Sequence, residues 1–182
     1  MPPERLRTIT RATEADDPAF WYVIDRAITY QSGWPLFGPP PRALFHPLPF
    51  PTLLAVLVSA VEAQARPGAG HLLDNATLNG CRALRFALTG RWHTKQAAAA
   101  WFAVRFPQFQ PVVSAAASSY EHGRAAGNRL IAEEVHELLD FVLERLLAMQ
   151  AAGVSQTRAR RAPDDLGLSR PFSDDLGLSP PR

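Results

Sequence analysis

Apolar residues recur at helical spacing along most of the chain, and no segment alternates apolar and polar residues as a half-buried strand would. The clearest stripe lies within residues 128–150, where apolar side chains share one face and glutamates occupy the other. This pattern predicts a core-facing helix over 128–150 that ends at Gly153. The residues of the stripe are Ile131, Val135, Leu138, Leu139, Val142, Leu146 and Met149.

Start and stop residues divide the preceding part of the chain into further helices. A capping aspartate and a proline at 17–18 start the first, Pro51 the second and Pro111 the last of them, while Thr94 can cap a helix and Gly90 can end one. Proline-rich residues 34–51 predict an extended connector with one short turn near 42–45. We therefore expect an all-α bundle of roughly six helices, with these ranges besides 128–150: 20–32, 52–64, 71–88, 95–106 and 111–120.

The composition changes near residue 154. The sequence DDLGLS occurs at 164–169 and again at 174–179, among arginine, serine and proline and with few large apolar residues. Such a segment cannot bury enough surface to fold alone. We expect residues 154–182 to be a disordered tail, after a helical domain at 51–153 and a first segment at 1–50 that includes the connector.

Composition and charge exclude several classes of protein. A chain of 182 residues that is 47% hydrophobic can bury one core, and a net charge of +2 offers no basic face for nucleic acid. The longest apolar run, residues 53–61, is about half a membrane span. Cys81 is the only cysteine, which excludes an internal disulfide. We expect a cytoplasmic protein without a nucleic-acid or membrane partner.

The candidate chemistry is confined to one loop, residues 89–95. None of the five histidines has the spacing of a helical metal site, and no glycine-rich phosphate loop is present, so we predict no metal site. Lys95 falls in the first turn of a predicted helix, where free N–H groups and the positive end of the dipole can bind a phosphate. A solvated lysine is the alternative interpretation.

Four motifs occur in a particular order within residues 71–147. They are NGCRAL at 79–84, LTGRWHTK at 88–95, AAAWFAVRFPQFQPVV at 98–113, and the tyrosine of SSYEHG, Tyr120. In this stretch the chain resembles the C-terminal helical domain of the aminoglycoside nucleotidyltransferases, the adenylyltransferases that modify streptomycin and spectinomycin. Residues 33–49 resemble the family's connector out of its nucleotidyltransferase domain, and residues 17–28 resemble the helix before it, so residues 1–50 look like the end of that domain plus the connector.

The resemblance implies transfer of AMP from Mg-ATP to an antibiotic hydroxyl, with release of pyrophosphate. Lys95 matches the family lysine that reaches the ATP phosphates, and Tyr120 matches a tyrosine near them. Asn75 and Arg82 lie on the helix that faces the antibiotic in the family, where Asp74 offers the nearby carboxylate for a cationic substrate. For Arg82, a structural ion pair is the alternative.

The sequence departs from the family at the metal site. The family's N-terminal domain holds magnesium with a Gly-Ser motif and an Asp-x-Asp pair, and this sequence contains neither pattern. Because magnesium positions the triphosphate for attack, we expect the chain to lack the catalytic domain, to be inactive alone and to need no cofactor by itself. The alternative is a non-catalytic helical interaction module that kept the fold and binds a partner through the surface near residues 18–32.

Overall fold

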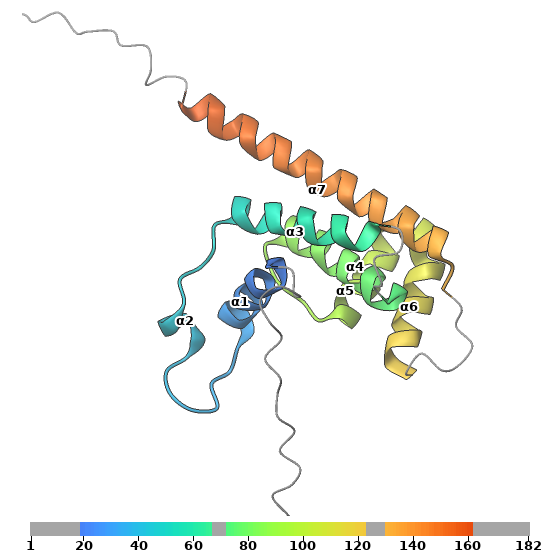
Figure 1. Cartoon of the computed structure of the whole chain (residues 1–182), viewed down its shortest axis with the longest axis horizontal. Helices are drawn as coiled ribbons and strands as arrows, with labels where there is room; N and C mark the ends of the chain where they lie inside the picture. Colours follow the sequence, from blue (N-terminus) through green and yellow to red (C-terminus); the bar gives the residue numbers. More distant parts are fainter. Residues whose placement is uncertain (1–18, 67–71, 123–129, 162–182) are drawn as a thin grey trace, which may run out of the picture.

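The computed structural model describes residues 19–66, 72–122 and 130–161, and these ranges form an all-α fold without strands (Figure 1). The six long helices correspond to the six predicted ones, and the predicted short turn is the small helix α2. A 3₁₀ turn, η2 (Pro107–Phe109), precedes α6. The helices are α1 (Phe20–Ser32), α2 (Pro41–Leu44), α3 (Phe50–Ala65), α4 (Leu73–Thr89), α5 (Lys95–Arg105), α6 (Gln110–His122) and α7 (Ala132–Arg161).

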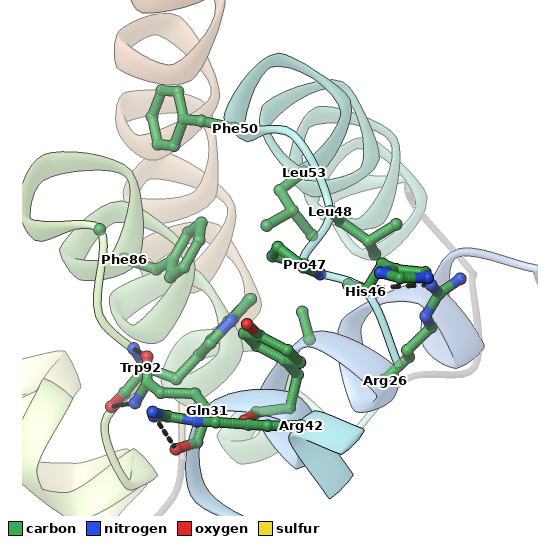
Figure 2. A pocket seen from close by; sticks show the side chains of 13 residues that line it. Arg26, Gln31, Arg42, His46, Pro47, Leu48, Phe50, Leu53, Phe86 and Trp92 are labelled. Carbon is green, nitrogen blue, oxygen red and sulfur yellow. Dashed lines mark hydrogen bonds between the residues drawn. The ribbon is translucent and has the colours of Figure 1, made fainter. Parts of the chain in front are cut away.

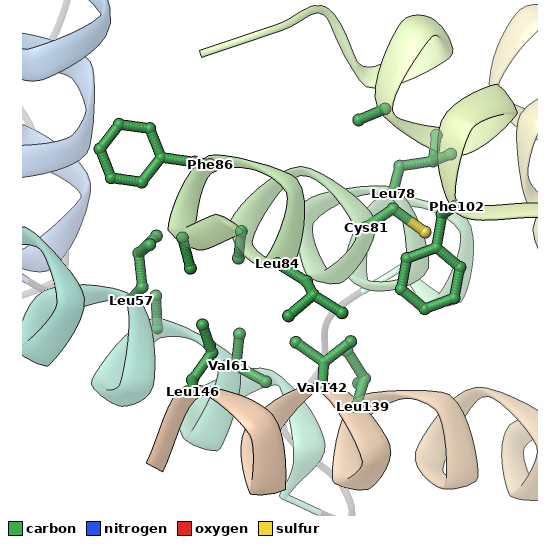
Figure 3. Packing of buried hydrophobic residues seen from close by; sticks show 14 of the residues in the cluster. Leu57, Val61, Leu78, Cys81, Leu84, Phe86, Phe102, Leu139, Val142 and Leu146 are labelled. Atoms are coloured by element: carbon green, nitrogen blue, oxygen red, sulfur yellow. The ribbon is translucent and has the colours of Figure 1, made fainter. Parts of the chain in front are cut away.

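The core forms where α7 packs on α3 and α4. The predicted stripe is confirmed for the five residues Val135, Leu138, Leu139, Val142 and Leu146, which have no exposed surface. Met149 is half-buried, and Ile131, which precedes α7, is 48% exposed. Figure 3 shows Leu139, Val142 and Leu146 facing Leu84 of α4 and Val61 of α3. Each such side chain stabilises the fold by about 1.5–3 kcal/mol through burial.

The ends of α7 differ from the prediction. The helix begins at Ala132, with Glu133 and Glu134 in its first turn, where carboxylates complement the positive end of the dipole. At the other end it continues through Gly153 to Arg161. A single glycine weakens a helix without stopping it, so the predicted end at Gly153 is wrong and residues 154–161 are helical. The rest of the predicted tail, residues 162–182, lies outside the described residues.

α4 is the central helix and contacts α3, α5, α6 and α7. Its predicted end is confirmed: Gly90 adopts a left-handed conformation with φ 69°, and its N–H donates to the Phe86 carbonyl. The predicted cap of α5 is also confirmed, since Thr94 Oγ1 accepts a hydrogen bond of 3.1 Å from the Ala97 N–H. These two features fix the short connection that leads from α4 to Lys95.

The connector between α1 and α3 is extended apart from α2, as the prolines predict. α3 begins at Phe50, with Pro51 in its first turn. The predicted cap of α1 at residues 17–18 lies outside the described ranges. None of the helices in those ranges combines the length and apolar content that crossing a bilayer requires.

Candidate functional site

One face of α4 carries a row of polar residues that ends in an aromatic pair. Asn75, Asn79, Arg82 and Phe86 are spaced by four, three and four residues, so they share a face. The chain leaving α4 returns along this face, and the ring of Trp92 stacks on that of Phe86 with centroids 4.1 Å apart. This return carries the chain from the C-terminal end of α4 back toward its N-terminal end, where Lys95 begins α5.

Lys95, Asn75 and Tyr120 meet at that end. The Lys95 ammonium donates a hydrogen bond to Asn75 Oδ1 and lies 4.8 Å from the centroid of the Tyr120 ring. Lys95 and Asn75 are half-buried, and Tyr120 is 40% exposed. The starts of α4 and α5 and the last turns of α6 therefore bring together three predicted site residues at a surface that solvent reaches.

Asp74 lies beneath this group and is buried, with 2% of its surface exposed. Its Oδ1 accepts a hydrogen bond of 2.7 Å from the Asn75 N–H, and its Oδ2 accepts one of 3.3 Å from the Ser119 hydroxyl. The carboxylate thus links the first turn of α4 to α6. The predicted direct contact of Asp74 with a substrate would require this turn to open, whereas a positioning role needs no rearrangement.

Arg82 lies farther along the same face of α4 and is half-buried. Its guanidinium lies over the Trp92 ring, 5.7 Å from the centroid. Burial lowers the pKa of Arg82, and the nearby Asp25 and Tyr120 side chains act to raise it. The guanidinium therefore packs on an aromatic ring and lies within electrostatic reach of Tyr120 of the cluster and of Asp25 on α1.

Two supporting residues have no signal in the sequence that would have identified them. The Gln31 side chain of α1 makes two hydrogen bonds with the Trp92 backbone. Its Nε2 donates to the Trp92 carbonyl at 2.9 Å, and its Oε1 accepts from the Trp92 N–H at 2.7 Å. Ser119 adjoins a predicted site residue, but only the fold shows its contact with Asp74. Gln31 and Trp92 are 61 positions apart, so no local pattern connects them.

The side chains of the Lys95–Asn75–Tyr120 cluster carry three kinds of hydrogen-bond donor, an ammonium, a phenol hydroxyl and an amide, and they lie at the positive end of α5. Such a set suits an anion with several oxygens. Within the described ranges, no three His, Cys, Asp or Glu residues gather in a way that could hold a metal ion. A cation and a hydroxyl donor at a surface that solvent reaches are groups that suit an anionic ligand.

Residues 43–145 match a protein family described as "Aminoglycoside adenylyltransferase, C-terminal domain". The match covers more than half of the chain and includes every predicted site residue. A comparison with curated proteins gave no match.

Proposed function

The chain belongs to the family of aminoglycoside adenylyltransferase C-terminal domains, and from this we propose that it forms one wall of an adenylyltransfer cleft in an intact enzyme. In that reaction AMP passes from Mg-ATP to an antibiotic hydroxyl. The convergence of Lys95, Asn75 and Tyr120 is the observation that carries the proposal. These residues come from three helices, and the fold brings them to one accessible surface.

Lys95 and Tyr120 bind the ATP phosphates in this proposal. The Lys95 ammonium adds its charge to the positive end of α5, and a phosphate oxygen would join or replace its contact with Asn75. The attacking hydroxyl oxygen bonds to the α-phosphorus as the bond to the pyrophosphate oxygen breaks and the hydroxyl loses its proton. Charge develops on the departing pyrophosphate, and a fixed cation and hydroxyl donor stabilise it there.

Asn75 and Arg82 face the antibiotic in this proposal, because they lie on the polar face of α4 beside the phosphate-binding pair. An amide both donates and accepts hydrogen bonds, which suits a polyhydroxylated ring. Asp74 acts indirectly by fixing the first turn of α4 through Ser119 and the Asn75 N–H.

The purified chain should not transfer AMP by itself, because its sequence has no Asp-x-Asp pair to hold magnesium. Incubation with Mg-ATP and either spectinomycin or streptomycin, followed by mass spectrometry, tests this. Adenylylated antibiotic that forms in proportion to the amount of chain would contradict the proposal.

Lys95 is the only lysine in the sequence, which allows a direct test of phosphate binding. Reductive methylation with ¹³C-formaldehyde keeps the positive charge and gives one ε-amine NMR signal, distinct from that of the chain's α-amine. We expect ATP and tripolyphosphate to shift this signal saturably.

Tyr120→Phe should weaken the binding of ATP and tripolyphosphate about fivefold, by removing one hydrogen-bond donor. Tyr22→Phe, an exposed tyrosine on α1, is the matched control and should have no effect. A Lys95 signal that does not move while ATP shifts other resonances would contradict the assignment.

A non-catalytic interaction module is the second candidate function, and the exposed apolar side chains favour it. Tyr22 on α1 is 58% exposed, and Phe37 in the connector is 96% exposed. The two candidate functions differ in whether they require the Lys95–Asn75–Tyr120 cluster. An interaction module should lose no partner binding in the Lys95→Gln variant, whereas the adenylyltransferase wall should lose phosphate binding.

A further inference from the structure

A cavity of about 360 Å³ lies between α1, the connector and the C-terminal end of α4 (Figure 2). It includes Phe86 and Gly90, whereas the Lys95–Asn75–Tyr120 cluster lies at the N-terminal end of α4. Eleven residues of helix separate Phe86 from Asn75, which is roughly 16 Å. The adenylyltransfer proposal assigns this cavity no role.

The floor of the cavity is apolar and largely aromatic. Ala27, Leu53, Phe86 and Trp92 line it and are all buried. The Phe86 and Trp92 rings stack at an interplanar angle of 19°, and the Phe50 ring lies 6.2 Å from that of Phe86. An apolar lining rich in aromatic side chains favours an aromatic ligand, whose ring can make edge-to-face as well as stacked contacts with them.

The rim of the cavity is cationic. Arg26 and Arg42 supply the positive charges, and none of the residues that line the cavity is acidic. Arg42 is held in place because its Nε and Nη2 donate to the Tyr30 and Gln31 carbonyls, each at 3.2 Å. Arg26 Nη2 donates to the His46 carbonyl at 3.3 Å. Since a guanidinium has five N–H donors, both arginines keep donors beyond these contacts.

We propose that this cavity binds a small aromatic anion. The ring lies against Phe86 and Trp92, and the carboxylate, sulfonate or phosphate group is directed toward Arg26 and Arg42. The volume lies within the range of small-molecule sites, which are mostly apolar with a few polar groups that fix orientation. The aromatic floor favours the ring of such a ligand. The two guanidinium groups, with no carboxylate among the lining residues, favour its anionic group.

A pair of probes with the same ring tests the charge requirement. The full chain, labelled with ¹⁵N, is titrated with 2-naphthalenesulfonate and, separately, with neutral 2-naphthalenemethanol. We expect the sulfonate to shift the signals of Trp92 and Phe86 saturably and the alcohol to bind at least threefold more weakly. Equal affinities, or sulfonate shifts confined to other regions, would overturn the proposal.

Two variants test the location. Ala27→Met extends a buried side chain at the cavity wall, so it should abolish sulfonate binding; unchanged affinity would overturn the proposal. If thermal unfolding shows that the Ala27→Met variant is not folded, the Arg42→Gln variant tests the location of the site instead. Arg42→Gln should weaken sulfonate binding up to about fivefold and leave alcohol binding unchanged. Arg105→Gln, an exposed arginine of α5, is the matched control.

The test is also independent of the adenylyltransfer proposal. Lys95→Gln should leave sulfonate binding unchanged, because Lys95 lies outside the cavity. A loss of sulfonate binding in that variant would place the probe at the Lys95–Asn75–Tyr120 cluster and overturn the inference of a separate site.

Discussion

Asp74 is the residue on which the geometry of the Lys95–Asn75–Tyr120 cluster depends most directly. Its buried carboxylate binds the Asn75 N–H and the Ser119 hydroxyl, so it fixes the backbone that carries Asn75 and the last turns of α6 that carry Tyr120. A carboxylate in the first turn also interacts favourably with the helix dipole. Removing it should disturb both stability and the site.

We predict that Asp74→Ala lowers the free energy of unfolding by about 2 kcal/mol, because a buried donor loses its acceptor and the helix end loses a charge. Ser119→Ala, which removes only the 3.3 Å contact, should cost about 1 kcal/mol or less. Urea denaturation of the two variants and the unmodified chain measures both values. A smaller loss for Asp74→Ala than for Ser119→Ala would show that the carboxylate does not organise this end of α4.

Cys81 gives a second prediction at the scale of one residue. The thiol has no exposed surface, and burial raises its pKa. We expect iodoacetamide at pH 8 to leave the native protein unmodified and to react readily in urea, because the reactive thiolate forms only on unfolding. Rapid alkylation of the native chain, followed by mass spectrometry, would contradict this.

The same shift in pKa has a consequence for stability. Above about pH 8.5 the thiol of the unfolded chain ionises. The buried Cys81 thiol keeps its proton, so the folded state binds more protons than the unfolded state. The contribution of Cys81 to stability is therefore fully present below that pH and decreases as the pH rises above it. Cys81→Ser should flatten this alkaline part of the stability profile.

At the scale of the elements, two glycines within helices have opposite surroundings. A Cβ on Gly80 of α4 would lie 2.9 Å from Leu139 Cδ2 of α7, whereas a Cβ on Gly153 of α7 would meet nothing within 4 Å. Gly80 therefore permits the close approach of α4 and α7, while Gly153 only weakens its helix.

We predict opposite effects for the same substitution at these two glycines. Gly153→Ala should increase helix content, with a gain of up to about 1 kcal/mol in local stability. At Gly80→Ala the same gain is outweighed by crowding against a fully buried leucine, and we expect a net loss of about 1 kcal/mol. Circular dichroism and thermal unfolding measure both effects. A more stable Gly80→Ala variant would show that Leu139 moves aside easily.

The elements whose boundaries could be predicted are those with strong local signals. Gly90 ends α4 and Thr94 caps α5 because single residues satisfy the backbone groups at those ends. The burial of the α7 stripe follows from its periodicity. The end of α7 could not be predicted from Gly153, because one glycine costs a helix only about 1 kcal/mol, which is too little to stop it.

The site could be predicted only in part, for a similar reason. The motifs suggested Lys95 and Tyr120 as candidate site residues, and the fold shows that their side chains lie together. Contacts between residues far apart in the sequence leave no local sequence pattern. The hydrogen bonds of Gln31 with the Trp92 backbone and of Ser119 with Asp74 could therefore not be predicted. The burial of Asp74 was also not predictable, because a charged residue in a first turn is usually solvated.

At the scale of the whole molecule, the connector presents an apolar surface. Trp34, Leu36 and Phe37 are 89%, 90% and 96% exposed. Adjacent exposed apolar side chains of this size usually mark a surface that another protein or domain covers. In the proposed intact enzyme another part of the molecule would cover it, and in the isolated chain it should promote association.

We therefore predict that the purified chain self-associates and that Leu36→Ser combined with Phe37→Ser weakens this association. The thermal midpoint should remain unchanged, because side chains with so much exposed surface contribute little to folding. Sedimentation velocity over a range of concentrations measures the association, and Val104→Ser, an 83% exposed apolar residue of α5, is the control for a scattered surface position. If the double variant associates as strongly as the unmodified chain, the connector is not the surface responsible. The exposed face of α1 that carries Tyr22 would then be the next surface to test.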